Sequence, residues 1–173
     1  DNWRWQDVPF YLRTGKRLAQ TASEVSIRFR PVPHQAYPYT AAEDHQPARL
    51  VLRLKPDEGM VLKLQVKVPG AHFTLAPADL HFSYAEAFRT RIPAAYETLL
   101  YEILAGDQSL FMRSDQIQAA WTLLQPVLDA WNNFPATDFP NYPAGSWGPE
   151  SAEGLISQDR RSWLVPSLPE NKT

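Results

Sequence analysis

Two stretches of alternating apolar residues, separated by a short turn, constrain this chain more than any other feature. Leucines occupy every second position from Leu50 to Leu54, and apolar residues occupy every second position from Met60 to Val68. A period of two places such residues on one face of a β-strand. The intervening segment 55–59, Lys-Pro-Asp-Glu-Gly, has proline and glycine where a tight turn needs them. The sequence therefore predicts a β-hairpin over residues 49–68.

Other stretches in the first half also predict strands. Residues 24–30 alternate between apolar and polar side chains, as a strand with one face on a core does. The apolar run Val8–Leu12 predicts a short buried strand that leads into a basic turn. Residues 73–75 and 80–84 predict two more short strands, separated by Pro77.

The pattern changes to helical spacing after Pro93. Apolar residues from Tyr96 to Leu104 recur on one helical face, and Gly106 follows as a C-terminal cap. A second helix is predicted to begin with Ser114 as its cap, to bury a stripe from Ile117 to Trp131, and to kink at a proline at position 126. A short helical turn is predicted over 151–157.

Strands followed by helices predict an α+β fold, a mostly antiparallel sheet with helices packed on one face. The other face of the sheet is a candidate subunit interface if it carries Val51, Val61, Leu12 or the aromatic residues. We expect one domain over residues 1–173, with a frayed tail over 164–173. The structured-looking sequence begins almost at once with Asp1, so we expect a domain cut from a longer chain.

Composition excludes several classes of protein. With 17 Lys and Arg against 19 Asp and Glu, the chain lacks the basic excess of a nucleic-acid binder. It has no cysteine, which excludes disulfides and thiolate chemistry. Its four histidines are scattered, so we expect no metal site. No apolar run reaches the roughly 20 residues of a membrane span, so we expect no membrane association.

The basic turn after Leu12 is the one candidate for ligand chemistry. Arg13, Lys16 and Arg17 surround Gly15, a composition that suits an anion because glycine admits close backbone approach and the cations supply charge-assisted hydrogen bonds. A solvated turn at a sheet edge explains the same residues. The residue types alone leave both interpretations open.

Several blocks of sequence resemble the C-terminal domain of glucose-6-phosphate 1-dehydrogenase over nearly the whole chain, and the last block resembles the bacterial branch of that family. In chain order the blocks are Asp1-Asn2-Trp3-Arg4-Trp5, Val8 to Leu18, Lys55-Pro56-Asp57-Glu58-Gly59, Pro93 to Glu97, Gly106 to Asp115, Ala119-Ala120-Trp121 and Tyr142 to Pro149.

The resemblance implies a function that this chain performs only in part. The family enzyme oxidises C1 of glucose 6-phosphate to 6-phosphogluconolactone, in the pentose phosphate pathway, and passes the hydride to NADP. Its histidine base and its Rossmann domain lie before the region that this chain resembles. We therefore expect no catalytic residue here, an inactive isolated chain, and NADP bound mainly by that missing domain. The resemblance also implies a cytoplasmic homo-oligomer, a dimer formed through the sheet, whose partners are glucose 6-phosphate and its own Rossmann domain.

Four residues are carried over from the family pattern. Lys16 matches the lysine that reaches the substrate. A second basic residue is usual where this chain has Thr21, and a glutamine is usual where it has Lys55, so these two positions are substrate-site predictions that depart from the pattern. Arg13 matches an arginine near the cofactor-binding or structural region. Residues 22–26 lack the basic cluster that holds a second, structural NADP in some members, so we expect none.

Two other classes of function stay open at this point. The departures at Thr21 and Lys55 suit a non-catalytic assembly module that keeps the fold and has lost the sugar-phosphate site. The 12% aromatic content suits a carbohydrate-binding module, although most of these rings lie at core spacings.

Overall fold

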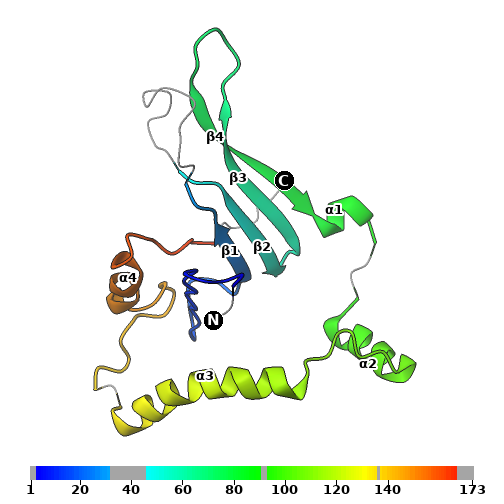
Figure 1. Cartoon of the computed structure of the whole chain (residues 1–173), viewed down its shortest axis with the longest axis vertical. Coiled ribbons are helices and arrows are strands. Elements are labelled where there is room, and N and C mark those ends of the chain that lie inside the picture. The colour runs from blue at the N-terminus through cyan, green and yellow to red at the C-terminus, as the bar shows by residue number, and fades with distance from the viewer. Residues whose placement is uncertain (1–2, 32–45, 91–92, 136, 167–173) are drawn as a thin grey trace. The chain divides into compact units, whose positions relative to one another are not determined.

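A computed structural model describes residues 3–31, 46–90, 93–135 and 137–166. The chain forms two compact units (Figure 1). Unit 1 comprises Asp1–Arg89 and Pro143–Thr173, and unit 2 comprises Thr90–Tyr142. The α+β class is confirmed, because unit 1 contains an antiparallel sheet and helices follow it along the chain. The single domain over 1–173 stays a prediction.

The sheet has four antiparallel strands in the order β1-β2-β3-β4. They are β1 (Ser23–Arg28), β2 (Arg49–Lys55), β3 (Gly59–Lys67) and β4 (Leu75–Ser83). The predicted hairpin is confirmed as β2 and β3, with Val51 paired with Val61 and Leu52 with Met60. The alternation of apolar and other residues predicts these strands because successive side chains of a β-strand point to opposite faces of the sheet.

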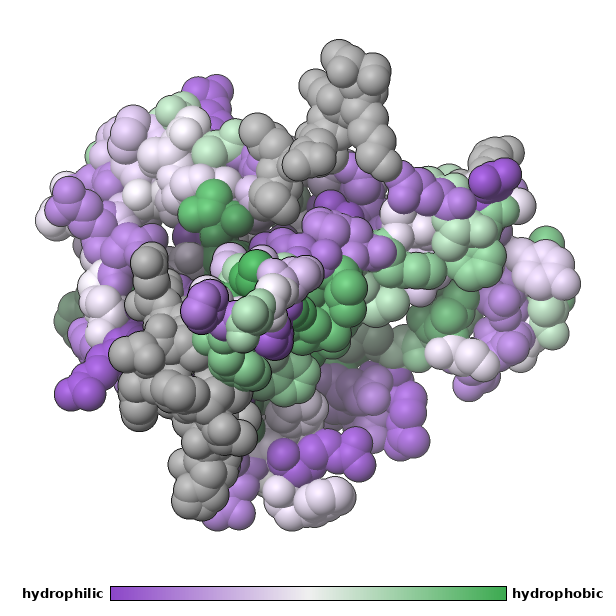
Figure 2. Space-filling model, turned by 90° about the horizontal axis from the view of Figure 1, so that it is seen from above, coloured by the Kyte–Doolittle hydropathy of each residue, from purple (hydrophilic) through white to green (hydrophobic). Residues whose placement is uncertain are grey.

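The predicted roles of the two sheet faces are reversed, because the face opposite the leucines holds the best-buried positions. Val51 and Val61 pair across the centre of the sheet and are each only 4% exposed. The leucine-rich face retains exposed side chains, and Leu80 on β4 is 59% exposed. Figure 2 shows apolar residues, in green, exposed among polar ones, in purple, on the side of the molecule that it views. The hydrophobic pattern thus predicts the strands correctly, whereas the degree of burial depends on what packs against each face.

Two strand predictions are wrong. Residues 8–12 form no strand, and Leu12 at their end is 84% exposed. An apolar run forms a strand only where another strand can pair with its backbone, and here the backbone of the following turn pairs with residues 145 and 146. The stretch around Pro77 is one strand, β4, rather than two. Among the described residues, β4 lies at the edge of the four-stranded sheet and pairs with β3 alone. A proline is tolerated within such a strand, because an edge strand has a neighbour on one side only.

Two short helices, α1 and α4, belong to the same unit as the sheet. Helix α1 (Tyr84–Phe88) begins at the end of β4, where the Ser83 hydroxyl accepts a hydrogen bond from the Glu86 amide at 3.4 Å. Phe88 stacks on Tyr84, with ring centroids 5.8 Å apart. Helix α4 (Glu150–Ser157) confirms the predicted helical turn, and its Ile156 is 4% exposed.

Unit 2 contains α2 (Ala95–Ala105) and α3 (Ser114–Asn133). Gly106 ends α2 with a left-handed φ of 72°, which confirms the predicted glycine cap. The cap of α3 is Arg113 instead of the predicted Ser114, and the Gln116 side chain accepts from the Arg113 amide at 3.3 Å. The helix continues through residue 126. Its stripe was predicted to be buried, but α3 contains no buried residue and Trp131 is 66% exposed. An amphipathic stripe is buried only where another element packs on it.

No helix in the described part of the chain is both long enough and apolar enough to cross a lipid bilayer.

Candidate functional site

The basic turn is held by main-chain hydrogen bonds to a segment more than a hundred residues away in the sequence. We define the Lys16 turn as residues 13–20 and the C-terminal arm as residues 143–166; both belong to unit 1. The Gly145 amide donates to the Arg17 carbonyl at 2.9 Å, and the Ala19 amide donates to the Ser146 carbonyl at 3.0 Å. Arg17 has a φ of 54°, so it, rather than a glycine, supplies a left-handed residue of this turn.

Arg13 lies at the centre of the contact between the turn and the arm. Its guanidinium carbon is 5.1 Å from the ring centroid of Trp147 and 4.8 Å from that of Trp163. Its Nη2 donates to the Leu164 carbonyl at 3.3 Å. These are cation–π geometries, each typically stabilising by about 0.5–2 kcal/mol. The contacts support a structural role for Arg13, and its predicted contact with the cofactor stays a prediction.

The end of the arm is held in the same way. The Gln20 side chain donates to the Pro166 carbonyl at 3.0 Å. Residues 164–166 were predicted as the start of a frayed tail, but two of their carbonyls accept hydrogen bonds from the Lys16 turn. Residues 167–173, the rest of the predicted tail, lie outside the described part of the chain.

A second set of contacts joins Tyr11 to the arm just beyond α4. The Tyr11 hydroxyl donates to Asp159, and the Arg161 guanidinium lies 5.9 Å from the Tyr11 ring centroid. The hydrogen bond to the Asp159 carboxylate raises the pKa of Tyr11, because it stabilises the protonated phenol. The Trp163 indole donates to the Ala152 carbonyl at 2.9 Å, which holds the end of the arm against α4.

The face of the sheet near Arg13 carries a carboxylate among arginines. Burial raises the pKa of Glu24, although the positive charges of Arg13, Arg53 and Arg49 act in the opposite direction. Burial likewise lowers the pKa of Arg49. The buried Nη1 of Arg13 and Nε of Arg53 have no hydrogen-bond partner.

Two of the predicted substrate residues, Thr21 and Lys55, lie near one end of the β1–β2 pair. Ser23 pairs with Lys55, and Thr21 lies two residues before Ser23 along the chain. Lys16 lies five residues before Thr21, on the anchored turn. All three are exposed. In Figure 1 the dark-blue segment before β1 lies at the end of the sheet where β2 finishes. Two exposed ammonium groups and a hydroxyl in this region are suited to the oxygens of a phosphate.

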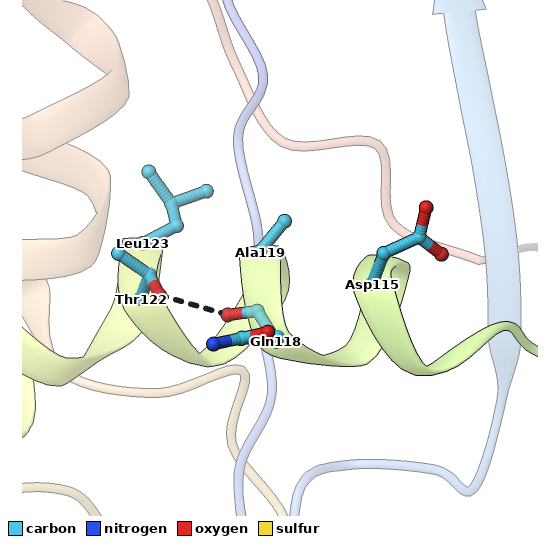
Figure 3. Close-up of a pocket in the computed structure, with 5 residues that line it drawn as sticks. All are labelled: Asp115, Gln118, Ala119, Thr122 and Leu123. Carbon is cyan, nitrogen blue, oxygen red and sulfur yellow. Dashed lines mark hydrogen bonds between the residues drawn. The ribbon is translucent and has the colours of Figure 1, made fainter.

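Other candidate residues do not join this group. His72 and His81 are exposed on the β3–β4 connection and on β4, whereas His34 and His45 lie outside the described residues. Within the part of the chain that the structure describes, no three His, Asp or Glu side chains gather as a metal site. A surface depression lies along α3, where Asp115, Gln118, Ala119, Thr122 and Leu123 line it (Figure 3). These lining residues come from a single helix and include none of the predicted site residues.

Sequence reasoning missed the two tryptophans whose rings contact the Arg13 guanidinium. Trp147 belongs to a block that the family resemblance identifies, but nothing in its spacing indicates a contact with residue 13. Trp163 carried no motif at all. Contacts over such sequence separations depend on the tertiary fold. The only signal in the sequence was that the block containing Arg13 and the block containing Trp147 resemble the same family.

The comparisons with known proteins agree on one family. The family model "Glucose-6-phosphate dehydrogenase, C-terminal domain" matches residues 1–164. The chain is 44% identical to glucose-6-phosphate 1-dehydrogenase of Chlamydia pneumoniae and 45% identical to that of Mycolicibacterium smegmatis, with 94% of this chain and 32% of each relative covered. It thus spans about a third of the length of these relatives.

Solved structures give the same result. The crystal structure of glucose-6-phosphate 1-dehydrogenase from Mycobacterium avium matches with a TM-score of 0.76 and 36% identity, over 98% of this chain and 34% of that one. A glucose-6-phosphate dehydrogenase in complex with glucose 6-phosphate matches with a TM-score of 0.70 and 30% identity, over 87% of this chain and 30% of that one. The chain belongs to the family of glucose-6-phosphate dehydrogenase C-terminal domains.

Proposed function

We propose that this domain supplies Lys16, with Thr21 and Lys55, to the glucose 6-phosphate site of an NADP-dependent glucose-6-phosphate dehydrogenase. The observation that carries the proposal is an exposed lysine on a turn that main-chain hydrogen bonds hold on both sides of residue 18. A cation held in this way can meet a phosphate at low entropic cost. One related protein is named as a complex with glucose 6-phosphate, which supports the choice of ligand.

The proposed chemistry divides between this domain and another. This domain binds and orients the sugar phosphate and closes the pocket from one side. A Rossmann domain of the same protein supplies the histidine base that removes the C1 hydroxyl proton and binds the NADP that accepts the hydride. The products are 6-phosphogluconolactone and NADPH. Lys55 replaces the usual glutamine as a phosphate donor, and Thr21 contributes a hydroxyl where a second cation is usual.

Cofactor, assembly and location follow from the same proposal. The described residues 22–26 of the chain include no Lys or Arg, which supports the absence of a structural NADP from this domain. We propose a homo-oligomer formed through the sheet, whose leucine-rich face keeps exposed side chains such as those of Leu54 and Leu80. The enzyme is proposed to act in the cytoplasm, where phosphorylated sugars and NADP are available.

The proposal is tested in the full-length dehydrogenase with Lys16→Ala. Loss of a charge-assisted hydrogen bond to phosphate costs about 1.5–3 kcal/mol, so the KM for glucose 6-phosphate should rise about 10- to 150-fold. The KM for NADP should stay within about twofold, because another domain binds that cofactor. Initial rates over a range of each substrate measure both constants.

Lys67→Ala is the matched control, because Lys67 ends β3 and its ammonium donates to the Val68 and Gly70 carbonyls at 3.0 and 2.8 Å. This variant should leave both KM values unchanged. An unchanged KM for glucose 6-phosphate in Lys16→Ala would refute the proposal and favour the non-catalytic assembly module.

A further inference from the structure

We infer that Arg13 is a positioning residue for the Lys16 turn, acting through Trp147 and Trp163 rather than on a ligand. This inference rests on the proposed role of Lys16 in holding the sugar phosphate. It assigns to the C-terminal arm a part in substrate binding, although the residues of that arm need not touch the substrate.

The contacts of the guanidinium leave it little freedom to serve elsewhere. Two indole rings lie 5.1 and 4.8 Å from its carbon, and one of its nitrogens donates to the Leu164 carbonyl at 3.3 Å. A planar guanidinium can stack on an aromatic ring with each of its faces and still use its edge for hydrogen bonds. A lysine ammonium has no such faces, so the Arg13 position is specific for arginine.

The anchors bracket Lys16 along the chain. Arg13 holds the turn three residues before it, and the main-chain bonds of Arg17 and Ala19 to the arm hold the turn after it. Between these anchors the turn contains Gly15, the most flexible residue type, and Arg17 in the unfavourable left-handed region with a φ of 54°. A turn of this composition needs external contacts to keep one conformation, and losing one anchor would release the segment that carries Lys16.

The charge of Arg13 also acts on the sheet. The positive charge of Arg13 opposes the rise that burial causes in the pKa of Glu24 on β1. Ser23, the residue before Glu24, pairs with Lys55. The charge of Arg13 therefore acts one residue from the end of the β1–β2 pair where Lys55 lies.

The test compares Arg13→Lys and Trp147→Leu in the full-length dehydrogenase, with Arg28→Lys as the matched control on the exposed end of β1. Arg13→Lys keeps the charge and removes the stacking, whereas Trp147→Leu keeps the arginine and removes one ring. Each should raise the KM for glucose 6-phosphate about tenfold, because the turn must then be ordered on binding. The KM for NADP and kcat should stay within about twofold. A rise in the KM for NADP, or an unchanged KM for glucose 6-phosphate, would overturn the inference.

Hydrogen exchange provides a readout that does not depend on activity. The amides of Ala19 and Gly145 are hydrogen-bonded between the turn and the arm, so peptides covering 17–20 and 143–147 should exchange faster in Arg13→Lys and Trp147→Leu. Arg28→Lys should leave this exchange unchanged. Equal exchange in Arg13→Lys and the wild type would refute the anchor itself. If Lys16 did not bind the substrate, Lys16→Ala would leave the KM for glucose 6-phosphate unchanged. That result would refute the proposed function, whereas the exchange measurement tests the anchor by itself.

Discussion

Replacing Gly59 by alanine tests the packing of the sheet most directly. Gly59 begins β3, is buried, and pairs with Ser83 of β4. A Cβ added there would lie 2.4 Å from the Phe82 carbonyl oxygen, whereas ordinary contact begins at 3.4 Å. The obstacle is backbone rather than a flexible side-chain end, so the two strands must separate by up to 1.0 Å, the difference between these distances.

The expected cost follows from two opposing effects. Overpacking of this kind destabilises by about 1–3 kcal/mol. Alanine recovers about 0.4–1 kcal/mol by restricting the unfolded chain, because Gly59 does not need a left-handed φ. The net loss lies between about 0 and 2.6 kcal/mol and is centred near about 1.3 kcal/mol, which lowers the urea midpoint by about 0.7 M at an m-value of about 2 kcal/mol/M. Circular dichroism during urea unfolding of the chain measures this midpoint.

Gly154→Ala is the matched control, because Gly154 lies inside α4 and an added Cβ meets no atom within 4 Å. Alanine is the better helix former, so this variant should be more stable by about 0.5–1 kcal/mol. The two glycine-to-alanine changes should therefore act in opposite directions. If Gly59→Ala were as stable as the wild type, β3 and β4 could not approach as closely as the structure places them.

Two further predictions concern pH. Burial raises the pKa of Glu24 above its ordinary value of 4.5, so the folded state binds its proton more tightly than the unfolded state does. Stability contributed by the protonated form is fully present below pH 4.5 and is lost as the pH rises through the raised pKa. Glu24→Gln should reduce this loss in the free energy of unfolding, measured with urea between pH 4 and 7. An unchanged dependence of that free energy on pH would contradict the prediction. Asp107 behaves oppositely: its carboxylate accepts from the Ser109 hydroxyl at 2.5 Å and the Ser109 amide at 2.8 Å, which lowers its pKa below the ordinary 3.8. Its stabilising contribution is present above pH 3.8 and is lost as the pH falls through the lowered value. An NMR titration of the Asp107 carboxyl should show that lowered value, and Ser109→Ala should raise it; a titration at or above 3.8 in the wild type would refute the assignment.

Local patterns in the sequence determined the secondary structure well where a regular period was present. Period-two alternation was sufficient to predict the β2–β3 hairpin, and the glycine after residue 105 was sufficient to predict the end of α2, because both depend on backbone geometry within a few residues. The resemblance of several short blocks was sufficient to identify the family. It also supplied Lys16, Thr21 and Lys55 as the residues proposed for the substrate site.

Only the tertiary structure decided which apolar residues are buried and what holds the basic turn. The run at 8–12 looks like a buried strand, but its environment is a side-chain contact with the C-terminal arm instead of a neighbouring strand. The stripe of α3 has helical period and no buried member. In the sequence Arg13 is one of three cations in a turn, whereas in the structure it contacts Trp147 and Trp163, more than a hundred residues away. Periodicity reports the geometry of one element, whereas burial and long-range pairing depend on which elements meet, and that is a property of the whole fold.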